Sequence, residues 1–145
     1  MKNILLGTII ATTAFLCSCN KEDDPKPVMG CTIPSATNYN AAATQNDGSC
    51  QFSTITFYGA YGYYSGVPIS GVSVSVNGDP IGNLSAIYPN GPGNCSAPGT
   101  VHYDFRDGNA VDWNGTIYLA NGVILYSAGT VSPYNTSCIK VNVTR

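Results

Sequence analysis

The chain carries few side chains that could catalyse a reaction. Its single histidine, His102, lies two residues before Asp104 in an alternating stretch, so both side chains are expected on one face of a strand. The opposite face takes Val101, Tyr103 and Phe105. A Ser-His-Asp triad needs a histidine held by buried partners, whereas the face of His102 is polar. We therefore interpret this pair as a solvated histidine beside a weakly interacting aspartate.

Carboxylates are equally few after residue 52, where they are Asp79, Asp104, Asp107 and Asp112, with no glutamate. A glycosidase needs two carboxylates that converge across the scissile bond. Residues 104–112 also lack the Asp-x-Asp-x-Asp-Gly spacing and the terminal glutamate of an EF-hand. We interpret this stretch as a connecting loop, with a calcium-stabilised turn as the alternative. The protein is thus not expected to be an enzyme, and a hydrolase ranks third among its possible functions.

Aromatic side chains are the richer supply, with ten tyrosines in a chain that is only 10% charged. Tyr61, Tyr63 and Tyr64 cluster among glycines, and the adjacent Tyr63 and Tyr64 cannot share one face of a strand. Exposed rings with polar tips suit sugar rings or protein partners. These three tyrosines are our candidate binding residues. The alternative is that they cover sheet edges and core margins.

The elements that would position these residues are strands. Ile55 and Phe57 alternate with polar residues, as do Val72, Val74 and Val76, and Asn77-Gly78 follows as a hairpin turn. Trp113, beside Asn114-Gly115 and before a strand, is the expected centre of the core. We predict an all-β fold: an antiparallel β-sandwich, immunoglobulin/fibronectin-III-like, over residues 53–145. The further strands are expected at 81–88, 101–105, 116–120, 123–127 and 139–144.

The N-terminus has the zones of a secretory signal. Lys2 precedes a mostly apolar stretch, residues 4–16, that is short for a membrane span of about 20 residues. The following Leu16-Cys17-Ser18-Cys19 resembles the lipobox of bacterial lipoproteins. This resemblance implies that residues 1–18 are a signal peptide and that Cys19 carries the lipid anchor to the membrane.

Residues 19–29 are expected to be the lipidated cysteine and a flexible tether, since prolines and charges replace apolar residues there. Within it, Asn20-Lys21-Glu22-Asp23-Asp24 resembles the export signal of surface lipoproteins in Bacteroidetes-type bacteria. The resemblance implies an outer-membrane protein exposed at the cell surface. An ordinary solvated charge cluster is the alternative.

Four cysteines remain beyond Cys19, an even number that favours disulfides outside the cytoplasm. Three pairings are possible, and we favour Cys31–Cys50 with Cys95–Cys138 because each pair brackets a self-contained segment. A zinc site is the weaker alternative, because the chain has no Cys-x-x-Cys and one histidine. We expect no metal and no cofactor.

Residues 30–52 form a separate disulfide module in this interpretation. The segment from Gly30-Cys31-Thr32 to Asp47-Gly48-Ser49-Cys50 resembles a short repeat of Bacteroidetes secreted proteins. Asn38 and Asn40 are expected to bond neighbouring backbone, and Asn46-Asp47-Gly48 to make a tight turn. Calcium binding is less favoured, because Asp47 is the one carboxylate left where the repeat has several.

The β region resembles small C-terminal domains of Bacteroidetes lipoproteins at residues 74–78, 95–99, 113–117 and Cys138. That resemblance supports the fold and implies no mechanism.

Net charge of −2 argues against nucleic acid as a partner. Together with the lipobox, the scarcity of catalytic groups and the clustered tyrosines, this leads us to expect a lipid-anchored, non-enzymatic interaction domain that binds a glycan or a protein. The alternative is a structural or accessory envelope lipoprotein without its own ligand.

Overall fold

The computed structural model describes residues 25–134 and 136–145. The expected signal peptide, the expected lipid-attachment residue Cys19 and residues 20–24 of the expected tether therefore lie outside the described residues. In the described ranges every helix or strand assigned is a β-strand, which confirms the all-β class. Across those same ranges, no helix has the length and apolar character to cross a membrane.

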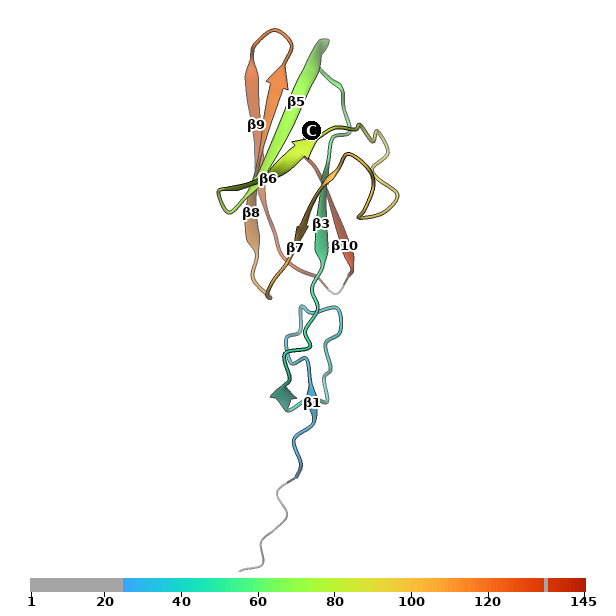
Figure 1. The fold of residues 1–145 in the computed structure, drawn as a ribbon, viewed down its shortest axis with the longest axis vertical. Coiled ribbons are helices and arrows are strands. Elements are labelled where there is room, and N and C mark those ends of the chain that lie inside the picture. The colour runs from blue at the N-terminus through green and yellow to red at the C-terminus, as the bar shows by residue number, and fades with distance from the viewer. Residues whose placement is uncertain (1–24, 135) are drawn as a thin grey trace, which may run out of the picture.

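The first part of the described chain is a small module at the lower end of the molecule (Figure 1). Its two short strands, β1 (Met29–Gly30) and β2 (Gln45–Asn46), pair in parallel. The disulfide Cys31–Cys50 closes the module, with an S–S distance of 2.03 Å. Few residues here are buried, so the cross-link takes the place of a core.

A three-stranded sheet has β3 (Thr54–Tyr58) at its centre. On one side β3 pairs antiparallel with β7 (Val101–Asp104), and on the other it pairs in parallel with β10 (Cys138–Asn142). The expectation of purely antiparallel pairing is thus wrong for β10. The second disulfide, Cys95–Cys138, ties the start of β10 to the loop before β7.

A five-stranded sheet is built on β5 (Val67–Val76). Along one edge β5 pairs with β4 (Tyr63–Tyr64) and β6 (Asp79–Leu84), and along the other with β8 (Val111–Leu119). Beyond β8 lies β9 (Ile124–Val131), which pairs with β8 alone and forms the outer edge (Figure 1).

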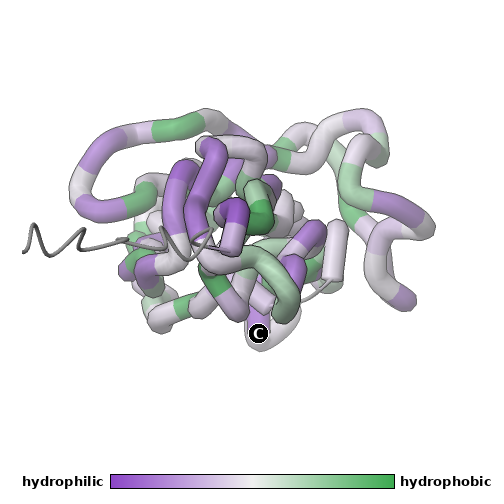
Figure 2. The backbone as a smooth tube through the Cα atoms, turned by 90° about the horizontal axis from the view of Figure 1, so that it is seen from below, coloured by the Kyte–Doolittle hydropathy of each residue, from purple (hydrophilic) through white to green (hydrophobic). Residues whose placement is uncertain are grey.

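The two larger sheets share one hydrophobic core. Ile55 and Phe57 of β3 meet the valines of β5 and the inward face of β8, where Trp113 is 2% exposed. The rings of Phe57 and Trp113 lie 5.7 Å apart. Along β8, every second residue is buried and the residues between are exposed or half-buried, and short hydrophobic and hydrophilic stretches alternate along the chain in Figure 2. Trp113 is therefore a core residue, as predicted.

The position of Trp113 along its strand differs from the prediction. Trp113 was expected before a strand, but it lies inside β8, which begins at Val111 and also contains Asn114 and Gly115. Gly115 is needed inside the strand because a Cβ there would overlap Cγ1 of Val143. Gly129, opposite Trp113 on β9, likewise leaves room for the indole ring, because a Cβ would lie 2.9 Å from its Nε1.

Candidate functional site

The candidate tyrosines lie between β3 and β5, where Tyr63 and Tyr64 belong to a hairpin and Tyr61 lies in the segment leading into it. Tyr63 and Tyr64 pair with Pro68 and Val67, so that two residues, Ser65-Gly66, form the turn. Both have positive φ, +48° and +81°. This is the conformation of a two-residue type I′ turn, whose twist matches that of the flanking strands. The hairpin is therefore a defined structure that holds the tyrosines in place.

The chain leading into this hairpin is fixed through its backbone. The N–H of Ala60 donates to Oδ1 of Asn142 (3.1 Å), and the N–H of Tyr61 donates to Oγ1 of Thr144 (3.0 Å). Farther along, the N–H of Ile69 donates to the carbonyl of Gly62 (2.8 Å). Because main-chain groups make these bonds, the tyrosine rings are left free to contact other molecules.

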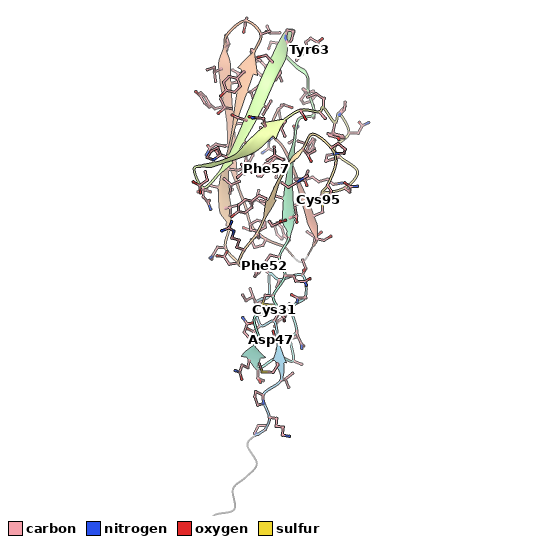
Figure 3. All side chains as sticks on the ribbon, in the orientation of Figure 1. Cys31, Asp47, Phe52, Phe57, Tyr63 and Cys95 are labelled. Carbon is pink, nitrogen blue, oxygen red and sulfur yellow. A yellow bond between two sulfur atoms is a disulfide. The ribbon has the colours of Figure 1, made fainter. Side chains whose placement is uncertain are left out.

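All three rings face solvent. Tyr61 is 57% exposed, Tyr63 67% and Tyr64 49%, and none belongs to the buried core. Figure 3 places Tyr63 at the end of the molecule farthest from Asp47 and Cys31 of the module. The site thus presents aromatic area at the end opposite the start of the described chain.

A small cavity of about 160 Å³ lies beside Tyr64. Its apolar lining comes from Ile69, Ile117 and Leu125, and Tyr126 is also among its lining residues. Ligand cavities for larger molecules are about 300–1,000 Å³, so this one fits a single ring or side chain. Thr144 and Arg145 complete its lining.

Tyr126 is a surface residue that the sequence interpretation did not single out. It is 76% exposed, the highest value among the exposed large hydrophobic side chains. The alternation of residues along β9 could have predicted this exposure, because Leu125 packs against the core and the next residue, Tyr126, points away from it. Tyr126 and Tyr64 line the same cavity because of how the strands pair, and the local sequence around either residue does not predict this.

The residues considered for catalysis have separate partners. His102 Nε2 lies 2.7 Å from Oγ1 of Thr100, and Asp104 Oδ1 accepts a hydrogen bond from Oγ1 of Thr54 (2.5 Å). Both side chains are on the exposed face of β7, opposite the buried Val101, as predicted. No hydrogen bond joins His102 to Asp104 within the described residues.

Of the remaining carboxylates, Asp107 caps a turn and Asp112 bonds across two paired strands. Asp107 Oδ1 accepts from the N–H of Asn109 (2.9 Å), and Asp112 Oδ1 accepts from Oγ1 of Thr130 (2.6 Å). In the part of the chain that the structure describes, no three His, Cys, Asp or Glu side chains gather as a metal site would require.

The module shows the predicted backbone bonding by asparagine. Asn38 Nδ2 donates to the carbonyl of Ser49 (2.6 Å), and Asn38 Oδ1 accepts from the N–H of Gln51 (2.8 Å). Asp47 Oδ1 accepts from the N–H of Ser49 (2.9 Å). Hydrogen bonds from the Ser49 hydroxyl and N–H lower the pKa of Asp47 below its ordinary value. Asp47 therefore acts as a turn cap, and the Asn46-Asp47-Gly48 turn is confirmed by the positive φ of Gly48, +80°.

The hairpin that carries Tyr63 and Tyr64, here called the tyrosine hairpin, can contact a ligand through aromatic rings and neutral hydrogen bonds. The backbone holds that hairpin and the cavity beside it adds a small apolar site.

Comparison of the chain with protein families, with curated proteins and with solved structures finds no match.

Proposed function

We propose that the mature protein is a lipid-anchored, non-enzymatic interaction domain at the outer-membrane surface, which binds a glycan or a protein through Tyr61, Tyr63 and Tyr64. The observation that carries this proposal is the exposure of all three rings, two of them on an ordered hairpin and that of Tyr61 in the segment leading into it. Tyrosine offers a large, flat face with a polar tip and has few rotatable bonds to immobilise on binding. The low charge of the chain leaves aromatic contact as the main source of affinity.

The arrangement of the molecule supports a role at a surface. Cys19 would attach the chain at its N-terminal end, and the disulfide module follows as a spacer. Tyr63 lies at the other end of the molecule, beyond the β region (Figures 1 and 3). An anchored domain contacts its surroundings most readily through the end farthest from the membrane. The tyrosine hairpin occupies that end.

The β region is proposed to be an immunoglobulin/fibronectin-III-like sandwich. Its support is the single core shared by the two larger sheets, with Trp113 near its centre. In such sandwiches the loops and hairpins at the ends are free to bind ligands, because the core is independent of them. The hairpin that carries Tyr63 and Tyr64 is of this kind.

The anchor is tested by Cys19→Ala. We expect this variant to lose labelling by an alkyne fatty acid and to be released from the membrane fraction, because the lipid requires the thiol. Labelling that persists unchanged in Cys19→Ala would exclude lipidation at this residue.

Ligand binding is tested by a glycan array and by a pull-down of surface proteins, both with residues 20–145. The triple variant Tyr61→Ala/Tyr63→Ala/Tyr64→Ala should lose every specific signal of the wild type. Tyr134→Ala is the matched control, because Tyr134 is 61% exposed but lies beside Ser53, at the opposite end of β3. Equal signals for the triple variant and the wild type would rule out the hairpin as the binding site.

A further inference from the structure

The outer edge of the five-stranded sheet is unusually open to another strand. β9 pairs only with β8 among the described residues, and Figure 1 shows it at the margin of the molecule. Its eight residues include no charged residue and no proline. Edge strands of soluble proteins are commonly protected by charges, prolines or bulges, because unpaired backbone groups attract other strands. β9 has none of these protections.

The pairing pattern identifies which backbone groups are free. The N–H of Leu119 donates to the carbonyl of Val123 (2.9 Å), so these two residues form a hydrogen-bonded pair. In an antiparallel ladder such pairs alternate. The odd-numbered residues of β9 therefore bond to β8. The N–H and C=O groups of four even-numbered residues point to the free edge, and these residues are Ile124, Tyr126, Ala128 and Thr130.

We propose that β9 pairs antiparallel with β9 of a second copy of this chain, about a twofold axis at Ser127. In this register Tyr126 lies opposite Ala128 of the second copy, and Leu125 opposite its Gly129. Each large side chain thus meets a small one on both faces of the ladder. The four outward-pointing residues of each copy pair with each other and form about eight main-chain hydrogen bonds.

Neighbouring registers are less favourable. Sliding by two residues in one direction sets Tyr126 against Tyr126 of the second copy, and in the other direction sets Ala128 against Ala128. Both shifts also leave backbone groups at one end of β9 unpaired. The size pattern of β9 therefore selects one register, and a second copy is the partner that matches it.

The pairing also sets the orientation of the two molecules. β9 runs roughly along the long axis of the molecule, so an antiparallel partner is inverted end to end (Figure 1). The two N-terminal ends then point in opposite directions. If the lipid anchor of the proposed function holds, this dimer joins copies on two facing surfaces, whereas the pairing itself does not depend on the anchor.

The test uses residues 20–145, which retain every described residue, in sedimentation equilibrium over a concentration series. Tyr126→Lys/Ala128→Lys places like charges opposite each other across the proposed axis, whereas Tyr126→Lys/Ala128→Glu places opposite charges there. Within one molecule both variants alter the same two exposed positions. We expect the wild type and the Lys/Glu variant to dimerise, and the Lys/Lys variant to have a Kd raised at least about tenfold.

Two results would overturn the proposal. One is a wild type that stays monomeric up to about 1 mM, because a Kd above this concentration corresponds to only weak association. The other is an equal Kd for the two double variants, because the register predicts that only one of them repels. Orientation is measured with a spin label at Lys26→Cys: the inverted dimer predicts that the two labels lie far apart, and a short distance would contradict it.

Discussion

The disulfide module and the β region are held together by different means. In residues 30–52 the buried hydrophobic residues are Cys31 and Ala36, and the Cys31–Cys50 bond and asparagine side chains hold the backbone. In residues 53–145 the backbone is held by a continuous core of twelve buried side chains, which include Phe57 and Trp113. A cross-link stabilises mainly by restricting the unfolded chain, whereas a core stabilises by burying apolar surface. The two regions should therefore respond to different mutations.

The two regions also touch. Gly108, in the loop before β8, lies against the module, where a Cβ would come within 2.9 Å of Ser35 Oγ and 3.1 Å of Ile33 Cγ2. Phe52, at the junction, packs against the edge of the larger core. Each region nevertheless has its own means of stabilisation, a disulfide or a core, so we expect each region to lose structure largely on its own.

The largest effect is expected in the β region, for Trp113→Ala. Loss of the buried indole should lower the free energy of unfolding by about 3–5 kcal/mol, measured by urea denaturation. Tyr118→Ala, on the exposed face of the same strand, is the control and should change it by less than about 1 kcal/mol. Similar losses in the two variants would show that β8 does not have one buried and one solvent-facing side.

The next effect is expected in the module, for Cys31→Ser/Cys50→Ser. Removing this cross-link should cost about 3 kcal/mol on the chain-entropy model. Hydrogen exchange should show lost amide protection in residues 30–50, with protection in β5 and β8 retained. If β5 and β8 lose protection to the same extent, the two regions fold as one unit and the contrast between them is wrong.

The smallest effect is expected at Asp47, whose pKa is lowered by its hydrogen bonds from Ser49. Because the folded-state pKa lies below the unfolded one, ionised Asp47 stabilises the module above its ordinary pKa. That stabilisation is lost as the pH falls through the folded-state pKa. An NMR titration should show the Ser49 amide shifting with a midpoint below the ordinary value for aspartate. A midpoint at the ordinary value, or the same shift in Asp47→Asn, would contradict the capping role.

The alternation of side chains predicted much of the β region. It located β7 and the C-terminal half of β5, and Asn77-Gly78 forms the expected turn, with φ of +51° and +89°. Such features depend on residues next to each other in the chain. The start of β8 was missed because Gly115 in its interior makes room for Val143, a residue distant in sequence. The parallel pairing of β10 with β3 is likewise set by contacts that no local pattern shows.

The candidate site was predictable to a similar degree. Glycines around adjacent tyrosines indicated exposed rings, and the structure leaves Tyr61, Tyr63 and Tyr64 exposed. The cavity beside Tyr64 could not be predicted, because β5, β8 and β9 must come together to line it with Ile69, Ile117 and Leu125.

The most direct measurement is a paired one on Tyr63→Ala, of affinity for the ligand found by screening and of melting temperature. Because Tyr63 is two-thirds exposed and the hairpin is held by its backbone, we expect an unchanged melting temperature. Loss of an aromatic anchor should cost about 2 kcal/mol or more of binding free energy. A lowered melting temperature with unchanged affinity in the folded fraction would contradict the proposal and show that this tyrosine serves the fold.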